Sequence, residues 1–402
     1  MNQRKDIQGD IAIVGGGASG LAAAIAAAQS GANTLLLEKL PRVGKKILAT
    51  GNGRCNLGNA LTKPDSYHGS IDPGPVLAAF AGEGAFFQSL GLRVSGPDTE
   101  GRLYPLSDQA ASVLDALRLA CGAYGVREIT EFNLQDIQAA EGAFQLKSKA
   151  GDRVTAKGVI LATGGLAGPK FGCTGDGLKL ARTLSHQVAD CYPALAPIPV
   201  EPDAVRALKG LRVTARVTAY KKGKTLGSAH GQVQFADAAL SGICVFNLAT
   251  HRPDCLGLNL LPDCNPALLL REIANLRSTA ALEDMLTGLF PKRIGQALIK
   301  TATKHPLTAP VSRLGEADLE ALARLISDWR FPSFPAQNWD TAQVTAGGVT
   351  GIGPGLESPH IPGLYFAGEL LDVHGGCGGY NLRWAWASGT MAGKMAARGL
   401  GL

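Results

Sequence analysis

The sequence predicts an α/β fold in which distant parts of the chain complete one parallel sheet around an inserted domain. Three observations predict it. A strand, a glycine-rich turn, a helix and a second strand follow one another near the N-terminus. Two further buried strands, near residues 160 and 365, are each followed directly by glycines. Between about 190 and 340 the pattern of the sequence changes. The length of 402 residues agrees with two to three domains.

The composition excludes several classes of protein. Hydrophobic residues make up 46% and charged residues 18% of the chain, which excludes a disordered protein. The longest apolar stretch, residues 21–28, is too short to span a membrane, and the eight cysteines form no CxxC pair. These features favour a cytoplasmic protein with free thiols. Glycine is in excess, at 52 residues without a collagen period, which indicates backbone that comes close to another group.

The first element is a strand at residues 10–14, and glycines with the GxGxxG spacing follow it at once. Gly15 permits a tight turn, Gly17 lets the backbone approach a pyrophosphate, and Gly20 lets the following helix pack closely on the strand. The N-terminus of that helix favours phosphate, and Glu38, at the end of the next strand, can bond ribose hydroxyls. We therefore expect dinucleotide contacts from Gly15, Gly17, Ala18, Ser19, Gly20, Glu38 and Lys39.

Two later segments indicate that the dinucleotide is FAD. Residues 158–165 predict a buried strand that ends in an "ATG" turn, which is typical of flavoproteins with two dinucleotide-binding domains. Residues 361–369 predict another such strand, and a glycine-rich loop leads from it to a helix that begins near Tyr380. The N-terminus of that helix would face the flavin pyrimidine edge, where negative charge grows on reduction. The FAD contacts expected from these parts are Thr163, Gly164, Gly165, Gly368, Glu369, Gly379, Tyr380, Asn381 and Leu382, and Leu134 is expected to contact the FAD as well.

These segments must converge on one cofactor, so the FAD-binding domain is expected to be discontinuous. No second strand–GxGxxG–helix–acid unit occurs in the sequence, so NAD(P)H would donate electrons by visiting the flavin transiently. No histidine or cysteine attachment motif is recognisable, so the FAD is expected to be bound non-covalently. Trp384 and Trp386, in the helix after the glycine-rich loop, are expected to pack in the core.

Residues 42–56, RVGKKILATGNGRCN, carry the most specific resemblance to a known family. They resemble the G-[RK]-K-x-L-x-[ST]-G-x-G-R-C-N signature of the BaiN/YhiN-like flavoproteins, also called the aminoacetone-oxidase-type family. Residues 101–107, 164–177, 344–349 and 379–382 resemble further motifs of this family. The resemblance covers nearly the whole chain.

The residues of this segment also indicate a role by themselves. The segment follows Glu38 directly, so it leaves the AMP end of the cofactor. Its glycines allow close passage of the backbone, and its cations can offset pyrophosphate charge. Cys55 has no partner at CxxC spacing, which favours a structural or steric role over a redox role. The contacts expected here are Gly44, Lys45, Lys46, Thr50, Gly51, Gly53, Arg54, Cys55 and Asn56.

The sequence departs from the family motifs in two places. Residues 235–243 lack the histidine and proline of a THxGxSGP-like stretch, which puts any role of that stretch in doubt. Arg383 stands where the family motif has glutamine, and it adds a cation near the expected flavin helix.

The inserted domain begins in a proline-rich linker. The resemblance implies a β-barrel-like subdomain that holds a small helical one, and the alternating and helical patterns of the insert agree with this. The expected fold is thus a two-dinucleotide-binding-domain (glutathione-reductase-like) FAD fold with inserted β-barrel-like and small helical subdomains. The expected boundaries are 1–190 and 341–402 for the FAD-binding Rossmann-like domain, 191–262 and 306–340 for the β-barrel-like insert, and 263–305 for the helical subdomain.

Positive charge is concentrated in the insert. Residues 191–340 carry 17 basic and 13 acidic residues, and residues 204–230 hold seven Lys or Arg with no acidic residue. A solvated surface explains such a cluster, and contact with an anionic substrate or RNA phosphates explains it as well. The expected partner is therefore a small-molecule substrate, or ribosomal RNA bound through the basic insert.

The flavin would carry the redox chemistry, while side chains near it position substrate and move protons. The catalytic candidates are Cys377 and His374 as proton donors, Arg102 as a clamp for a substrate anion, and Tyr104.

The family resemblance implies several activities. The leading hypothesis is reduction of an activated C=C bond with electrons from NAD(P)H, and the basic insert favours uridine in ribosomal RNA, reduced to dihydrouridine, as its target. The alternatives are an oxidase of small amino-ketones or amines that uses O2, and a non-catalytic flavin-containing factor that binds RNA or protein.

Overall fold

The computed structural model describes residues 6–140 and 142–402. The chain divides into two compact units: one runs to Pro193 and resumes with Trp339–Leu402, and the other comprises Ala194–Asn338. The expected insert was 191–340, so each observed boundary lies within three residues of the expected one.

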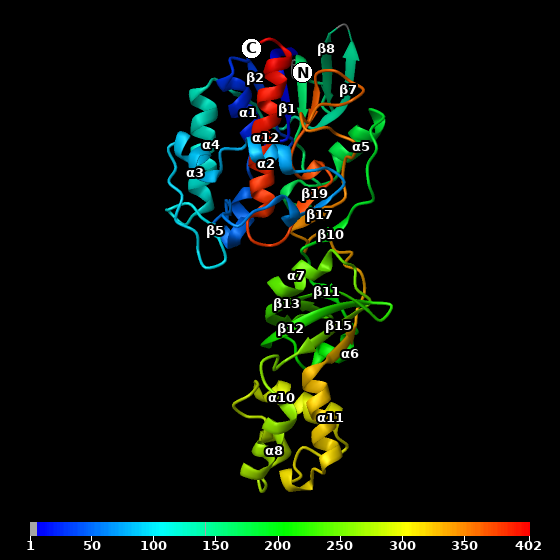
Figure 1. The fold of residues 1–402 in the computed structure, drawn as a ribbon. Coiled ribbons are helices and arrows are strands. Elements are labelled where there is room, and N and C mark those ends of the chain that lie inside the picture. Colours follow the sequence, from blue (N-terminus) through cyan, green and yellow to red (C-terminus); the bar gives the residue numbers. More distant parts are fainter. Residues whose placement is uncertain (1–5, 141) are drawn as a thin grey trace. The chain divides into compact units, whose positions relative to one another are not determined.

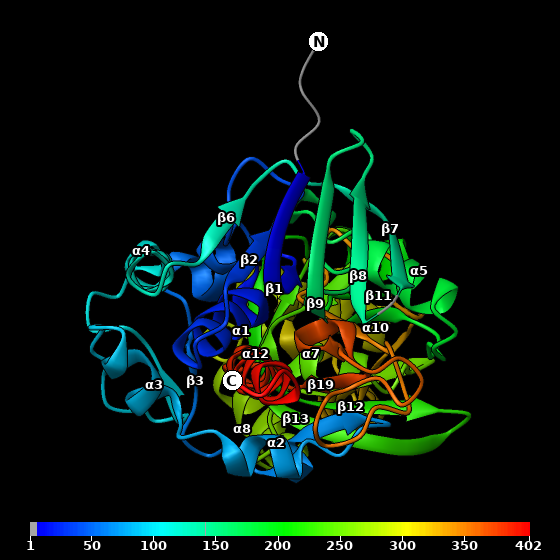
Figure 2. The ribbon, with the colours of Figure 1, turned by 90° about the horizontal axis from the view of Figure 1, so that it is seen from above.

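The first unit is built on a parallel sheet whose strands end in line (Figures 1 and 2). Its parallel strands lie in the order β6 (Arg127–Ile129), β2 (Thr34–Leu37), β1 (Asp6–Val14) and β9 (Arg153–Leu161), with β18 (Leu364–Phe366) also paired to β9. Val14 is in register with Leu37 and with Leu161, and Leu161 is in register with Phe366. The turns that follow β1, β2, β9 and β18 therefore meet at the carboxyl edge of the sheet, where ligands bind in open α/β sheets.

Strand β9 has two sets of neighbours along its length. Its first half, residues 153–156, pairs with β8 (Ala143–Ser148), which in turn pairs with β7 (Leu134–Ala140) in an antiparallel hairpin. Its second half, residues 159–161, pairs with β18 from the far end of the chain. The sheet is thus completed by strands that precede the inserted unit in the sequence and by a strand that follows it.

Two helices far apart in the sequence, α1 (Ala18–Gln29) and α12 (Tyr380–Gly399), pack against each other (Figure 1). A Cβ atom at Gly389 or Gly393 of α12 would overlap the α1 backbone at Ser19 or Ala23. Glycine therefore lets the two helix backbones approach closely. The other elements of this unit are η1 (Ile47–Gly53), β3 (Gly58–Asn59), η2 (Pro64–Ser66), β4 (Tyr67–Gly69), α2 (Gly74–Ala79), α3 (Glu83–Ser89), β5 (Arg102–Leu103), α4 (Ala110–Ala123), η3 (Pro169–Phe171), α5 (Asp176–Thr183), β17 (Val344–Ala346), η5 (Gly368–Leu370) and β19 (Val373–Gly375), and β10 (Tyr192–Ala194) leads out of it.

The inserted unit contains an antiparallel sheet that is close to a closed barrel. Its six strands lie in the order β11 (Ile198–Pro199), β14 (Ala239–Ser241), β13 (Lys224–Phe235), β12 (Arg212–Lys221), β15 (Cys255–Asn259) and β16 (Trp329–Pro332). A bridge between Val200 and Ser333 joins the two edges. Alternate residues of β12, among them Val213 and Val217, are buried in the core of this unit, whereas Arg212 and Arg216 are exposed. Helix α7 (Ile243–Ala249) packs on β13, and α6 (Pro202–Arg206) follows β11.

The helical part of the insert is longer than the predicted 263–305. It consists of α8 (Pro266–Leu276), α9 (Leu282–Met285), α10 (Lys292–Ala302), η4 (Val311–Arg313) and α11 (Glu316–Ser327). Helix α11 falls in the segment that the sequence assigned to the barrel. It belongs to the helices because its apolar stripe, including Leu319, Leu322 and Ile326, is buried in the core of this unit, and because it packs on α8 and α10. Within the described residues, no helix is long and apolar enough to cross a membrane.

Candidate active site

The GxGxxG turn has the geometry of a phosphate-binding turn. Gly15 has φ 108°, and a Cβ there would lie 2.5 Å from the carbonyl oxygen of Ala162, so this position requires glycine. A Cβ at Gly20 would overlap the carbonyl oxygen of Gly15. Gly17, by contrast, has open space around it, and no side chain among the described residues caps the N-terminus of α1 behind it. Two glycines thus serve packing, while the backbone near Gly17 and the first N–H groups of α1 are left for an anion.

Glu38 holds the loops at the end of the sheet together. Its Oε2 accepts a hydrogen bond from the N–H of Gly16 at 2.8 Å, and its Oε1 accepts one from the N–H of Leu40 at 2.8 Å. The backbone N–H of Phe132 donates to the carbonyl oxygen of Glu38, which brings the segment before β7 beside it. Leu134, the first residue of β7, is buried in the core of this unit. These contacts bring Glu38 and the segment before Leu134 together at the end of the sheet, and their contact with adenosine stays a prediction.

The three lysines that were predicted to contact FAD differ in whether a carboxylate binds them. Lys39 forms an ion pair with Asp176 at 2.6 Å, so it ties its loop to α5. Lys46 forms an ion pair with Glu369 at 2.7 Å. Burial disfavours its charge, but the Glu369 carboxylate outweighs this and raises the pKa of Lys46. Lys45 is exposed and has no ion pair among the described residues. Of the three, Lys45 is the cation that is not bound to a carboxylate.

The segment from Gly44 to Asn56 carries both packing and ligand-facing positions. A Cβ at Gly44 would overlap the Leu114 side chain, so this glycine lets the segment pack on α4. Gly51 adopts φ 56°, and a Cβ there would lie 2.8 Å from the backbone nitrogen of Asn56. Cys55 is fully buried, and burial raises the pKa of its thiol to about 11, which agrees with a structural role. The remaining predicted contacts, Thr50 and Gly53, lie in the same 3-10 segment.

Asn56 is the residue of this segment that most clearly indicates a ligand. Its Oδ1 atom is buried and has no hydrogen-bond partner among the described residues. A Cβ at Gly379 would lie 2.7 Å from this atom. An unpaired buried oxygen beside the start of α12 is an acceptor that a bound molecule can satisfy.

The turn after β9 packs against the segment that follows the insert. A Cβ at Gly165 would overlap the Thr345 side chain, and the Oγ1 of Thr345 accepts hydrogen bonds from the N–H groups of Leu166 and Ala167. Gly164 has φ 71°. Thr345 holds the backbone directly after the predicted Thr163–Gly165 turn, and nothing in its local sequence predicts this role.

The glycine-rich loop before α12 is held by side chains of that helix. Asn381 accepts a hydrogen bond from the N–H of Gly375 at 2.8 Å and donates to the carbonyl oxygen of the same residue at 3.0 Å. Gly379, with φ 100°, precedes the first turn, and the Tyr67 hydroxyl donates to the carbonyl oxygen of Tyr380. Leu382 packs at the edge of the core. The loop conformation is thus held by the chain's own side chains.

The two tryptophans of α12 are core residues, as expected, and both also position loops. The Nε1 of Trp384 donates to the carbonyl oxygen of Gly368 at 3.1 Å, and the Nε1 of Trp386 donates to that of Leu57 at 2.9 Å. Through these two hydrogen bonds, helix α12 holds the turn after β18 and the segment after Asn56 in place.

Arg383, which was expected to add a cation near the flavin helix, is paired with a buried carboxylate. Its Nη1 donates to Oε2 of Glu83 at 2.6 Å, and Glu83 is 2% exposed. Glu83 lies at the start of α3, and nothing in its local sequence marked it as a partner of a residue three hundred positions later.

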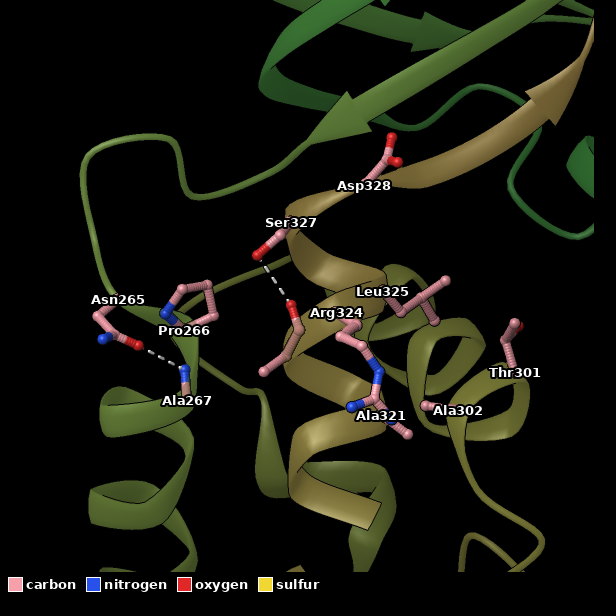
Figure 3. Close-up of a pocket in the computed structure, with 11 residues that line it drawn as sticks. Asn265, Pro266, Ala267, Thr301, Ala302, Ala321, Arg324, Leu325, Ser327 and Asp328 are labelled. Carbon is pink, nitrogen blue, oxygen red and sulfur yellow. Dashed lines mark hydrogen bonds between the residues drawn. The ribbon is translucent and has the colours of Figure 1, made fainter. Parts of the chain in front are cut away.

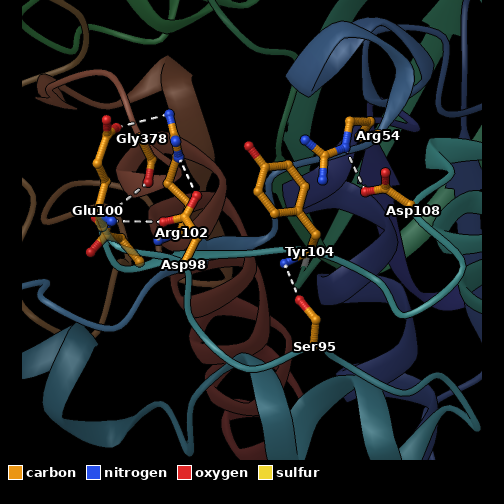
Figure 4. A network of polar contacts seen from close by, with 9 residues as sticks. Arg54, Ser95, Asp98, Glu100, Arg102, Tyr104, Asp108 and Gly378 are labelled. Carbon is orange, nitrogen blue, oxygen red and sulfur yellow. Dashed lines mark hydrogen bonds and ion pairs between the residues drawn. The ribbon is translucent and has the colours of Figure 1, made fainter.

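Arg102 and Tyr104 belong to separate polar groups (Figure 4). Arg102 binds Asp98 at 2.7 Å and Glu100 at 2.8 Å, so its charge is balanced by two carboxylates. The Arg54 guanidinium stacks over the Tyr104 ring at 4.1 Å and pairs with Asp108 at 2.5 Å. This geometry gives no support to Arg102 as a clamp for a substrate anion.

His374 lies in β19, and Cys377 lies in the glycine-rich loop that follows this strand. His374 is 4% exposed, and burial is the main cause that lowers its pKa to about 4. Neither of its ring nitrogens has a hydrogen-bond partner among the described residues. The thiol of Cys377 lies 3.8 Å from Oε1 of Gln343, and burial raises its pKa to about 12. At neutral pH His374 is therefore uncharged and Cys377 is protonated.

A depression in the inserted unit is separate from these groups (Figure 3). It is lined by residues of α8, α10 and α11, most of them small or apolar. Its two charged residues are already paired, Arg324 with Glu320 and Asp328 with Arg330. We find no chemistry there comparable to that of the first unit.

The residues of the first unit fit an FAD molecule. The uncapped start of α1, the Glu38 carboxylate and the buried unpaired oxygen of Asn56 belong to segments that one edge of the sheet brings together. Glu38 would hold the adenosine ribose, the start of α1 the pyrophosphate, and the start of α12 the flavin.

Comparisons with known proteins agree with this assignment. The family model of the HI0933-like protein Rossmann domain matches residues 9–395. The chain belongs to the HI0933-like family. This confirms the resemblance to the BaiN/YhiN-like flavoproteins.

Two curated relatives of this HI0933-like chain cover it almost completely. The "3-dehydro-bile acid delta(4,6)-reductase" of Clostridium scindens is 38% identical over 96% of this chain and 98% of the relative. The "Ribosomal RNA dihydrouridine synthase" of Escherichia coli K12 is 29% identical over 94% of this chain and 96% of the relative.

Solved structures share the fold. A flavocytochrome c3 fumarate reductase has a TM-score of 0.52 at 17% identity, and the match covers 98% of this chain and 78% of that one. The E. coli quinol fumarate reductase subunit FrdA has a TM-score of 0.52 at 19% identity, with 99% and 71% covered. The family and its curated relatives show that the chain is an FAD-dependent oxidoreductase, which leaves the non-catalytic alternative without support, whereas the solved structures show the shared fold.

Proposed function

We propose that this protein uses FAD to reduce a C=C bond conjugated to a carbonyl group in a small molecule. The observation that carries the proposal is the 38% identity, over 96% of the chain, with a relative whose name describes such a reduction. The site supports it, because it combines the cradle described above with an uncharged histidine and a protonated thiol.

The chemistry requires a hydride and a proton. Reduced FAD supplies the hydride when it is bound, and NAD(P)H is the proposed electron donor. The thiol of Cys377 is protonated throughout the neutral range, so it is the candidate source of the proton. Asn381 and Trp384 keep the loop and the turn around the reacting groups in place.

A half-reaction experiment tests the proposal. The purified protein is reduced with NAD(P)H without oxygen, and a 3-keto steroid acid with a conjugated double bond is then added. We expect the flavin absorbance to return and the product to carry two additional hydrogens by mass. Rapid reoxidation by O2 with peroxide release and turnover of aminoacetone, without reaction of the enone, would instead establish the oxidase alternative.

A second candidate substrate is uridine in ribosomal RNA. The observation that favours it is the lysine-rich turn between β12 and β13: Lys221, Lys222 and Lys224 are exposed and have no ion pair among the described residues. A relative with 29% identity carries the corresponding name. Incubation of the NAD(P)H-reduced protein with ribosomal RNA, followed by mass mapping of dihydrouridine, tests this candidate, and unchanged RNA excludes it.

A further inference from the structure

His374 is a buried side chain whose hydrogen-bonding capacity is unused. It lies in β19, is 4% exposed, and neither Nδ1 nor Nε2 has a partner in the described part of the chain. A buried polar group left unpaired destabilises the fold, so each such group requires an explanation. The neighbouring Asn381 does not satisfy it, because its amide is engaged by the backbone of Gly375 and Gly376.

The surroundings of His374 place it beside the expected flavin segments. It immediately precedes the glycine-rich loop that leads to α12. Its register partner in β4 is His68, and the two ring centroids are 5.5 Å apart. The carboxylates of Glu369 and Asp372 act on it electrostatically. Glu369 is the same residue that binds Lys46, so His374 belongs to the cluster around the turn after β18.

The charge state of this imidazole determines what it can do. Burial and the neighbouring His68 lower its pKa to about 4, while Asp372 and Glu369 oppose this only in part. A neutral imidazole carries one N–H donor and one acceptor nitrogen. At neutral pH it is therefore a hydrogen-bond donor rather than a source of protons, which differs from the proton-transfer role expected from the sequence. Neutral histidine donors stabilise negative charge on a carbonyl oxygen in other enzymes.

We propose that the ring N–H of His374 donates a hydrogen bond to the carbonyl oxygen of the substrate and stabilises the charge that grows there. This role rests on the reductase function proposed above. The β-carbon would accept the hydride that reduced FAD supplies when it is bound, and the electron pair of the C=C bond would shift toward the carbonyl oxygen. The Cys377 thiol would give its proton to the α-carbon to form the new C–H bond, and solvent would then reprotonate the thiolate. The substrate gains two electrons, and NAD(P)H is their source. His374 keeps its own proton throughout.

Three variants test this assignment: His374→Phe removes the donor, His374→Gln keeps a donor that does not titrate, and His68→Phe is the matched control on the paired strand. We expect all three to keep their flavin and to be reduced by NAD(P)H at the wild-type rate. Reoxidation by the enone should fall roughly 10²-fold in His374→Phe, as for other lost carbonyl donors, and recover in part in His374→Gln. The wild-type rate of this step should show no titration near pH 6.5.

The outcomes separate the two proposals. If wild-type protein does not reduce the enone, the reductase function fails. The affinity for a saturated ketone analogue, read from the perturbed flavin spectrum, then tests His374 alone, since the donor role requires weaker binding in His374→Phe than in His68→Phe. If wild-type protein reduces the enone and His374→Phe does so equally fast with equal ketone affinity, the role of His374 is refuted while the function stands.

Discussion

Several charged residues of this protein form ion pairs with residues that lie far away in the sequence. The pair of Arg383 with Glu83 is the clearest case. Glu83 is 2% exposed, and burial raises the pKa of its carboxyl although Arg383 counteracts this. The family motif has a neutral glutamine at position 383. An arginine is tolerated here because α3 supplies a buried carboxylate to it.

We therefore expect Arg383→Gln to lower the free energy of unfolding by about 3–5 kcal/mol, because it leaves the Glu83 carboxylate buried without a partner. The double variant Glu83→Gln/Arg383→Gln should recover most of the loss, because no buried charge remains. Denaturant unfolding of the two single variants and the double variant measures the coupling. Additive effects would show that the pair is not a unit.

A second residue-level prediction concerns pH. The pKa of His374 in the folded protein is about 4, below its ordinary 6.5, so its neutral form is the one that folding favours. Its contribution is fully present above pH 6.5 and is lost as the pH falls toward 4, by up to about 3 kcal/mol. His374→Phe should therefore lose less stability than wild type between pH 6.5 and 4. Thermal unfolding at matched pH values measures this, and parallel curves would contradict it.

At this scale the sequence predicted the residues whose role is local. Glu38 and the turn glycines follow from spacing alone, because one βαβ unit positions all of them. The partners of Lys46 and Arg383 could not be predicted, because each ion pair joins segments that only the tertiary fold brings together. That neither ring nitrogen of His374 has a hydrogen-bond partner among the described residues could not be predicted either. It depends on which groups the neighbouring side chains already bind.

At the scale of elements, the packing of α12 on α1 explains two glycines of α12 that had no predicted role. Gly389 and Gly393 face helix backbone and allow close contact between the two helices. The sequence predicted both helices but not their contact, because neither carries a signal that specifies the other. The same limit explains why α11 was placed in the barrel.

Gly393→Ala should destabilise the protein by roughly 1–3 kcal/mol, because a Cβ there overlaps the Ala23 carbonyl and forces the helices apart. Gly122→Ala is the matched control in α4, where a Cβ meets nothing within 4 Å. It should stabilise the protein by up to about 1 kcal/mol through helix propensity. Melting temperature and flavin retention measure both variants, and equal effects would rule out the packing argument.

On the scale of the whole molecule, the discontinuous FAD domain and its insert were predictable because three motifs at distant positions point to one cofactor. The substrate was not predictable, because some basic residues of the insert form ion pairs within the protein and others do not. Arg206 and Lys209 are bound by Asp203 and Asp237, whereas the three lysines of the β12–β13 turn are not paired within the described chain. Charge counted along the sequence cannot separate these cases.

Replacing Lys221, Lys222 and Lys224 with glutamine tests whether this surface binds RNA. We expect unchanged flavin content and enone reduction, together with weaker RNA binding whose log–log salt slope falls by roughly 2–3. Glutamine at Lys147, Lys179 and Lys394, exposed lysines of the other unit, changes the net charge equally and serves as the control. The same loss of RNA affinity in both triple variants would indicate an effect of net charge alone.

The divided pairing of β9 also has a consequence for synthesis. The second half of β9 cannot pair with β18 until the chain beyond the insert has been synthesised. Until then, the face of α1 that α12 covers is exposed as well. At about 5–20 residues per second, translation of residues 194–338 separates these events by roughly 7 to 30 seconds. During that interval the nascent chain carries an incomplete sheet and an exposed apolar helix. Its capture of FAD comes late, and chaperone demand should be highest while the insert is on the ribosome.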